Sequence, residues 1–246
     1  MTNKTSLRIG IAAFALISSP AMAQTASAPA DGTDSSEIVV TAQRRSEKLS
    51  DVPASITALS ADALSAASVT ASTDLAKVTP GLTMQFYGSF LQPDLRGVTS
   101  GGANVGEASN VATYIDGVYQ PQQLATLLEL PDVEQVEVLK GPQGALYGQN
   151  ATGGAILVNS YAPSFTASGK FSASYGNFNA INLRGFVTAP VNDSLAFSLA
   201  GGLHNRDGFL LQLITGQRDK CLDSKAIRGK VLIKPSESAK FTLTAY

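Results

Sequence analysis

Between residues 171 and 245, apolar side chains return at every second position in separate runs, a pattern that few structures satisfy. Five runs show it: Phe171–Tyr175, Ile181–Val187, Leu195–Leu203, Ile227–Ile233 and Phe241–Ala245. Successive side chains of a strand point to opposite faces, so a period of two predicts strands with one apolar and one polar face. Short turn sequences at 176–179, 190–194 and 235–238, and a longer polar loop at 205–224, predict an antiparallel arrangement.

Such strands fit either the wall of a transmembrane β-barrel or a soluble β-sandwich, and periodicity alone does not separate the two. Only 15% of the residues are charged, which is low for a soluble surface. Residues 1–23 favour the barrel further because they are typical of a secretory signal peptide. Its parts are the positive Lys4 and Arg8, the apolar Ile9–Ser19 and the cleavage site Ala21-Met22-Ala23 before Gln24.

The predicted strands are too few for a closed barrel. Five strands cannot close a membrane barrel, since the smallest kind needs about eight. The last run still alternates where the sequence stops at Tyr246. An open edge in lipid would leave backbone polar groups unsatisfied. We therefore expect the chain to be the front part of a longer protein.

Composition excludes several classes of function. The 18 Lys and Arg residues balance 19 Asp and Glu residues, so no cationic field favours nucleic acid. Cys221 is the only cysteine and His204 the only histidine, and both are interpreted as bystander surface residues. Asp116, Glu134 and Glu137 are spaced as turn and strand-face residues and form no catalytic constellation. We expect no enzyme, no cofactor and no metal site.

Residues 24–49 read as a flexible linker, because 24–36 are small and polar. Within it, Glu37-Ile38-Val39-Val40-Thr41-Ala42 is an isolated β-branched run. One interpretation is an edge strand of the following domain. The other is an extended peptide, presented on a tether, that adds to another protein's sheet edge by main-chain hydrogen bonds. The residues alone favour the two about equally.

Residues 50–162 predict a compact α+β domain with short elements. The expected elements are a strand at 52–59, a helix at 61–67 with Ser60 as N-cap, a helix at 75–78 capped by Thr73-Asp74, two strand pieces about the Asp116-Gly117 turn, a helical stretch at 124–130, and strands at 134–140 and 155–159.

A glycine-rich stretch, Gly141–Gly154, separates the last two of these strands. A phosphate-binding loop would need Lys and Ser or Thr after its second glycine, but Gly154 and Ala155 follow Gly153. A dinucleotide fingerprint needs glycines two and then three apart, which the stretch lacks. We therefore expect sharp chain reversal and backbone packed against a barrel wall, where Cβ atoms would clash.

The run Glu137–Gly148 followed by Asn150–Ile156 closely resembles the plug domain of TonB-dependent outer-membrane receptors. Further segments stand in the family's order: Glu37–Ala42, Val52–Ile56, Pro80–Leu82, Leu95–Val98 and Tyr114–Val118. The positions that match plug motifs are Arg96, Gly97, Asp116, Gly117, Glu137, Lys140, Gly141, Pro142, Gly144, Gly148, Asn150, Gly153 and Gly154. Lys140 stands where the family usually has Arg, and Asn159-Ser160-Tyr161 replaces the usual exit sequence.

The resemblance implies a plug at 50–162 inside a 22-stranded barrel, of which 163–246 would supply about the first five strands. It implies that 37–42 are a TonB box, with Glu37, Ile38, Val39, Val40, Thr41 and Ala42 binding TonB, itself energised by ExbB and ExbD. It also implies contact with outer-membrane lipid and substrate docking on the loops 84–92 and 100–109, with Gln85, Phe86, Tyr87 and Asn104 as candidates.

The expected function is uptake of a scarce nutrient, such as a ferric siderophore, across the outer membrane into the periplasm. Saccharides, cobalamin and aromatic compounds are the alternative cargoes. The alternative function is a truncated, non-transporting fragment or a plug-like binding module, and we expect the isolated chain not to transport.

Overall fold

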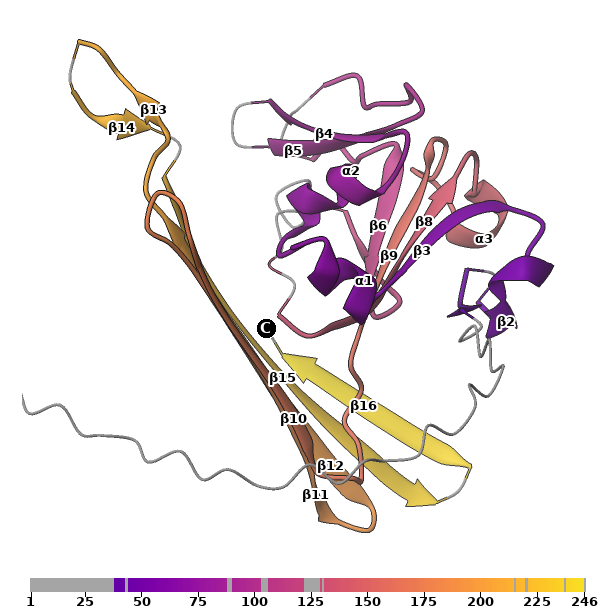
Figure 1. The fold of residues 1–246 in the computed structure, drawn as a ribbon. Helices are drawn as coiled ribbons and strands as arrows, with labels where there is room; N and C mark the ends of the chain where they lie inside the picture. Colours follow the sequence, from indigo (N-terminus) through magenta and orange to yellow (C-terminus); the bar gives the residue numbers. More distant parts are fainter. Residues whose placement is uncertain are drawn as a thin grey trace, which may run out of the picture. The chain divides into compact units, whose positions relative to one another are not determined.

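Two five-stranded sheets form the framework of the chain (Figure 1). The computed structural model describes residues 38–42, 44–87, 90–102, 106–121, 129, 131–214, 216–219, 221–236 and 238–245, all within the unit Glu37–Tyr246. The helix expected at 124–130 lies outside the described residues, apart from Glu129. Within the described part, no helix is both long and apolar enough to cross a membrane.

The first sheet is mixed and has the strand order β3-β8-β9-β6-β7. Its strands are β3 (Ser55–Ser60), β6 (Val111–Ile115), β7 (Val118–Gln120), β8 (Val133–Lys140) and β9 (Gly154–Ser160). Only β6 and β9 are parallel neighbours; the other pairs are antiparallel. Asp116 and Gly117 join β6 to β7 with φ values of 48° and 80°. Positive φ at both central residues is what a tight hairpin turn requires, so the predicted turn is confirmed.

Short helices begin where the sequence provides caps. Helix α1 (Ala61–Ala66) starts after Ser60, whose hydroxyl accepts a hydrogen bond from the Ala63 N–H, as predicted. Helix α2 (Leu75–Val78) has the predicted bounds, but the Asp74 side chain does not cap it. The Asp74 carboxylate instead accepts from the N–H groups of Thr70 and Ala71, ahead of the 3₁₀ turn η2 (Ser72–Asp74).

Two apolar layers cover the two faces of the mixed sheet. Helices α1 and α2 lie on one side of it, and α3 (Gly144–Tyr147) lies on the other (Figure 1). Along β8, Val136 and Val138 belong to the first layer, whereas Leu139 belongs to the second. Alternate side chains of these strands therefore belong to two separate hydrophobic cores, one on each face of the sheet. Whatever covers the second face must be apolar too.

Two small hairpins adjoin this domain. Strands β4 (Leu82–Tyr87) and β5 (Phe90–Leu95) pair antiparallel, with the exposed side chains of Phe86 and Tyr87 near their turn. Strands β1 (Val39–Val40) and β2 (Glu47–Lys48) form the second pair and are followed by the 3₁₀ turn η1 (Leu49–Asp51).

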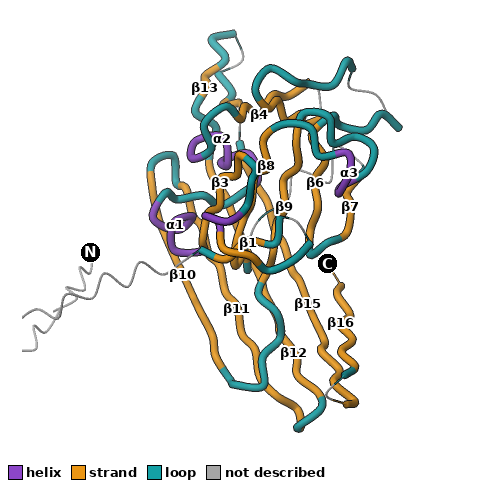
Figure 2. The backbone as a smooth tube through the Cα atoms, turned by 90° about the vertical axis from the view of Figure 1, so that its right-hand side faces the viewer, coloured by secondary structure: helices purple, strands orange, loops and turns teal. Residues whose placement is uncertain are grey.

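The second sheet is wholly antiparallel, with the order β10-β11-β12-β15-β16 (Figure 2). Its strands are β10 (Ser168–Gly176), β11 (Ala180–Asn192), β12 (Leu195–Arg206), β15 (Leu222–Ser236) and β16 (Ala239–Ala245). We call it the long-strand sheet. The predicted register of faces is confirmed: Phe197, for example, lies opposite Ala189 on one side and Val231 on the other.

Burial distinguishes the two faces of the long-strand sheet. The large apolar side chains are exposed, with Phe171 at 76% and Tyr175 at 73%, whereas Ala196, Ser198 and Ala200 on the opposite face are buried. A soluble sandwich would bury its large apolar side chains between two sheets. The observed exposure is the reverse, as expected for a face that contacts lipid.

The loop expected at 205–224 is shorter and less polar than predicted. Strand β12 continues to Arg206, and β15 already begins at Leu222. Between them, β13 (Leu210–Leu211) pairs with β14 (Arg218–Asp219). The large apolar side chains between β12 and β14 are exposed. The expectation of a uniformly polar loop was therefore wrong for the residues that precede β14.

Candidate functional site: the docked N-terminal segment

Residues 38–42, which we call the docked segment, are hydrogen-bonded to the rest of the chain along their backbone. Val39 and Val40 pair with Lys48 and Glu47. The Ile38 carbonyl accepts from the Leu49 N–H at 2.9 Å. These bonds close a hairpin within the chain, so the strand already has a partner.

Apolar burial fixes the docked segment on the second face of the mixed sheet. Val40 is 0% exposed and Ala42 is 1% exposed, and both belong to the layer that contains Leu139, Tyr147 and Leu157. Ile38 and Val39 are largely exposed. The alternation of a strand therefore places one β-branched side chain in the core and its neighbours in solvent.

Glu137 of β8 is the polar anchor of the docked segment. Its Oε1 accepts from the Thr41 N–H and from the Thr41 hydroxyl, both at 2.9 Å, and from Asn159 Nδ2 at 3.3 Å. The Glu137 side chain is fully buried, and its Oε2 has no hydrogen-bond partner among the described residues. Burial raises the pKa of the Glu137 carboxyl above its ordinary value of 4.5, although the bonds from Thr41 oppose the rise.

Tyrosine side chains complete the anchor. The Tyr147 hydroxyl donates to the Ala42 carbonyl at 2.8 Å, and the Tyr114 hydroxyl donates to the Tyr147 carbonyl at 2.7 Å. The Arg44 guanidinium lies 5.5 Å from the Tyr147 ring centroid. Burial, with the nearby Glu137, raises the pKa of Tyr147 to about 12, so its hydroxyl remains a donor throughout the physiological range.

Residues 38–42 form a strand that packs on the following domain, but β1 pairs with β2 and is not an edge strand of the mixed sheet. A free, tethered peptide is not what residues 38–42 form, because Val40, Ala42 and the Thr41 N–H all have partners. Glu37 lies outside the described residues. A cavity of about 300 Å³ lies beside the docked segment, lined in part by Thr41, Arg44 and Asn159.

The Arg96-Gly97 motif forms the turn that follows β5. Arg96 has φ 56° and Gly97 has φ 81°, and the Gly97 N–H donates to the Asp94 carboxylate at 2.8 Å. The Arg96 guanidinium donates to the Ser55 hydroxyl at 2.8 Å. This motif therefore ties the β4–β5 hairpin to β3 and makes no hydrogen bond to the docked segment among the described residues.

The glycine stretch folds against its own domain. A Cβ at Gly153 would lie 2.9 Å from Val98 Cγ1, and one at Gly154 would collide with the Leu139 carbonyl oxygen. Among the described residues, Gly153 and Gly154 therefore pack against β5, β6, β8 and the turn after β5, whereas the sequence predicted packing against a barrel wall.

Other residues of the stretch adopt the backbone conformations that its turns require. Gly141 and Gly148 have φ values of 98° and 71°, and Asn150 also has a positive φ while donating to the Tyr119 hydroxyl. Pro142 and Gly144 are exposed and lead into α3. Lys140, at the end of β8, is half-buried and pairs in register with Ser55 and Gly154.

Asp116 links the mixed sheet to the long-strand sheet. Its carboxylate accepts from the Ser160 N–H at 2.8 Å and lies 2.9 Å from the Lys230 ammonium, which also contacts the Ser160 hydroxyl. Burial by itself would raise the pKa of Asp116, but the bonds from Ser160 and Lys230 outweigh it and hold the pKa below 3.8. The turn residue predicted at this position is thus also an ion-pair partner.

A second ion pair joins Asp132 to Arg228 at 2.5 Å, with both side chains almost fully buried. The sequence prediction missed Asp132. A signal for it was present on β15, where Arg228 and Lys230 occupy alternate positions opposite Ala200 and Ser198 of β12. Cations on the face of a barrel strand that points away from lipid require acidic partners. Arg184 of β11 adds a bond from its guanidinium to the Val69 carbonyl.

The remaining predicted residues are distributed over other parts of the structure. Gln85, Phe86 and Tyr87 lie together on β4, where the Tyr87 hydroxyl donates to Gln85 Oε1. Asn104 lies outside the described residues. Cys221 is exposed, as expected, but His204 is not a surface residue: its Nδ1 lies 3.9 Å from the Glu129 carboxylate, and both side chains are mostly buried.

Residues 48–155 match the model of the TonB-dependent Receptor Plug Domain. The chain carries the plug domain of a TonB-dependent receptor. The match covers β3, β6, β7 and β8 of the mixed sheet and the first two residues of β9. It also covers the helices on both faces of this sheet. The docked segment precedes the matched region, and the long-strand sheet follows it.

Relatives extend the likeness beyond the plug. The pesticin receptor of Yersinia pestis is 35% identical over 198 residues, which is 79% of this chain and 29% of the relative. The ferrioxamine receptor of Yersinia enterocolitica is 30% identical over 175 residues, or 68% of this chain and 22% of the relative. The crystal structure of the ferric yersiniabactin uptake receptor of Yersinia pestis superimposes with a TM-score of 0.67 at 32% identity, covering 75% of this chain and 29% of that one. The chain thus spans less than a third of these receptors.

Proposed function

We propose that the chain is part of a TonB-dependent outer-membrane transporter that takes up a scarce nutrient, with a ferric siderophore as the first candidate cargo. The observation that carries the proposal is the identity to the pesticin receptor, which runs through both the plug and the long-strand sheet. The relatives named for ferric yersiniabactin and ferrioxamine support a ferric chelate as the first candidate. A vitamin B12 transporter of Vibrio vulnificus, 27% identical over 190 residues, supports cobalamin as the alternative cargo.

In this proposal each part of the chain has a mechanical role. The exposed apolar face of the long-strand sheet contacts outer-membrane lipid, and its buried face holds the plug through Lys230 and Arg228. The docked segment is the TonB box, which binds TonB by strand addition. TonB, energised by ExbB and ExbD, then pulls on the plug from the periplasm.

The cargo is tested by uptake. Deleting the coding region of this chain in its bacterium is expected to abolish accumulation of radiolabelled iron supplied as ferric yersiniabactin or ferrioxamine, and to leave cobalamin accumulation unchanged. Loss of cobalamin uptake alone would contradict the iron chelate. Uptake that persists when TonB is deleted would contradict the mechanism as a whole.

The partner is tested by substitution in the docked segment. Val39→Pro is expected to abolish binding of the chain to the periplasmic domain of TonB, because proline has no N–H to pair and breaks strand addition. Val39→Thr keeps a β-branched, strand-compatible side chain and is the matched control. Equal affinity of the proline and threonine variants, measured by calorimetry, would show that residue 39 does not pair with TonB.

A further inference from the structure

The backbone groups that a partner strand would need are already occupied within the chain. The Thr41 N–H donates to Glu137, the Ala42 carbonyl accepts from Tyr147, and the Val39 carbonyl accepts from Gln135 Nε2 at 3.0 Å. A backbone donor cannot serve the plug and a partner strand in the same geometry. The docked state and a partner-bound state therefore exclude each other.

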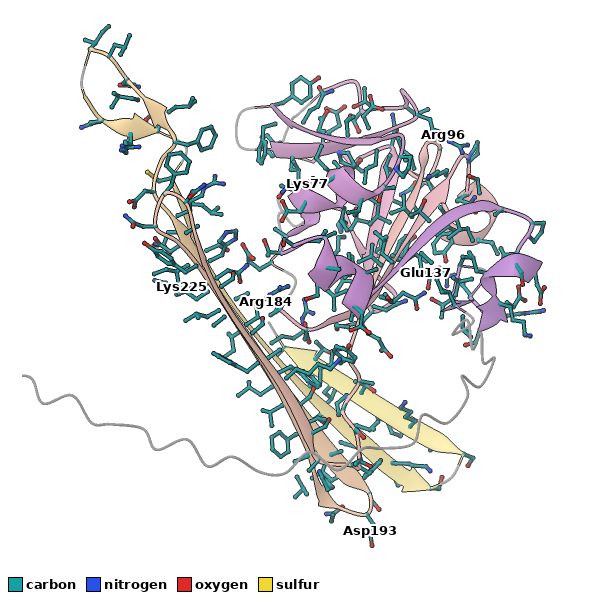
Figure 3. All side chains as sticks on the ribbon, viewed as in Figure 1. Lys77, Arg96, Glu137, Arg184, Asp193 and Lys225 are labelled. Atoms are coloured by element: carbon teal, nitrogen blue, oxygen red, sulfur yellow. The ribbon has the colours of Figure 1, made fainter. Side chains whose placement is uncertain are left out.

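Glu137 is the one charged group in this set of contacts, and it lies at the contact between β8 and the docked segment (Figure 3). All three hydrogen bonds come to a single oxygen, Oε1, and all come from neutral donors. The side chain is fully buried, and Oε2 has no partner among the described residues. A carboxylate held in this way is poorly compensated for the water it has lost.

Release of the docked segment reverses that loss. When Thr41 and Val40 leave, the Glu137 carboxylate regains water, while Val40 and Ala42 lose their apolar burial. Hydration of the charge favours release, and the apolar contacts together with the three hydrogen bonds favour docking. The segment is docked in the structure, so the contacts that favour docking outweigh the hydration of the charge. Loss of the hydrogen bonds to Glu137 then shifts this balance toward release.

We propose that Glu137 is a positioning residue that holds residues 38–42 on the plug and so sets the fraction of chains able to offer this segment to a partner strand. That the partner is TonB rests on the proposed function; that the segment is held by Glu137 does not. A partner that binds only the released segment has its apparent affinity reduced by the fraction of chains that are docked. Weakening the anchor must therefore tighten partner binding.

The test uses the full chain in detergent with a nitroxide label at residue 38, where the side chain is 40% exposed. Ile38→Cys is made together with Cys221→Ser, because Cys221 is the only native thiol. Glu137→Ala is expected to raise the ratio of mobile to immobile label about tenfold or more, the effect of losing hydrogen bonds to a charged acceptor. Thr41→Val removes one of the three donors while keeping the backbone N–H and the β-branched shape, so a smaller rise of a few-fold is expected.

Glu134→Ala is the matched control, because Glu134 lies on the same strand, β8, with an exposed side chain. It is expected to leave the label unchanged. If Glu137→Ala destabilises the plug, Thr41→Val still decides the matter, since Thr41 lies on the docked segment itself. An unchanged label in both Glu137→Ala and Thr41→Val would overturn the proposal, as would an equal effect of Glu134→Ala.

Binding of the periplasmic domain of TonB separates the two proposals. If Glu137 holds the segment and TonB is the partner, Glu137→Ala lowers the apparent Kd by the same factor by which it frees the label. A freed label without TonB binding in any variant would contradict the proposed partner and support the anchor. TonB binding that is equal in the native chain and in Glu137→Ala, with an unchanged label, would contradict the anchor and support the partner.

Discussion

Single glycines in the stretch Gly141–Gly154 meet two different physical demands. Gly141 and Gly148 adopt positive φ values at turns and have open space where a Cβ would stand. Gly154 differs, because a Cβ there would meet the Leu139 carbonyl oxygen and lie 2.5 Å from Leu95 Cδ2. The sequence shows only that glycines are dense here; the lack of room for a Cβ at Gly154 comes from β5 and β8, which pack against it.

The clash at Gly154 predicts a large loss of stability. Gly154→Ala is expected to lower the free energy of unfolding by about 1–3 kcal/mol, because neither the β8 backbone nor Leu95 can move away freely. Gly144→Ala, at the start of α3, has no neighbour within 4 Å of the new methyl group and is expected to be neutral or slightly stabilising. Urea unfolding followed by circular dichroism compares the two; equal midpoints would contradict the packing argument.

Glu137 also predicts how docking depends on pH. Its pKa is raised in the docked state, so the docked state binds the proton more tightly than the released state does. Docking is therefore strongest below the ordinary pKa of 4.5 and weakens as pH rises through the docked pKa. The groups that face Glu137 do not titrate in this range: Thr41 and Asn159 are neutral, and the pKa of Tyr147 is about 12.

The pH dependence is measured with the label at residue 38 between pH 4 and pH 7. The mobile fraction is expected to grow as pH rises, and Glu137→Gln, which cannot ionise, is expected to flatten the curve. A mobile fraction that grows on acidification, or an unchanged slope in Glu137→Gln, would show that another group controls docking.

At the scale of elements, the sequence predicted the features that depend on neighbouring residues and missed the contacts between residues that are distant in the chain. Ser60 capping α1, the Asp116-Gly117 turn and the alternation of the long strands are local signals, and the structure confirms them. The packing of the docked segment was left open, because Thr41 and Glu137 are 96 residues apart. Asp132 was missed for the same reason, since its partner Arg228 is equally distant in the chain.

At the scale of the whole molecule, two acids, the buried Glu137 and the partly exposed Asp116, give the plug opposite responses to pH. The pKa of Asp116 is held below 3.8, so its contact with Lys230 is fully present above that value and is lost as pH falls through the lowered pKa. The raised pKa of Glu137 has the opposite sign, so acid tightens the docked segment. Acidification thus loosens the plug from the long-strand sheet while fastening the segment to the plug, and the two contacts can be tested independently.

The contact between plug and long-strand sheet is tested at Lys230. Lys230→Met keeps the length of the side chain but removes the ammonium group that contacts Asp116 and Ser160, and it is expected to weaken the local structure by about 1–3 kcal/mol. The readout is hydrogen exchange at the Ser160 N–H, which donates to Asp116. Lys225→Met on the same strand, where the side chain is 71% exposed, is the control and is expected to change nothing (Figure 3).

Because the Asp116 carboxylate is the shared acceptor, Lys230→Met combined with Asp116→Asn should cost less than the sum of the two single changes. Additive losses would mean that Lys230 acts on the plug through some group other than Asp116.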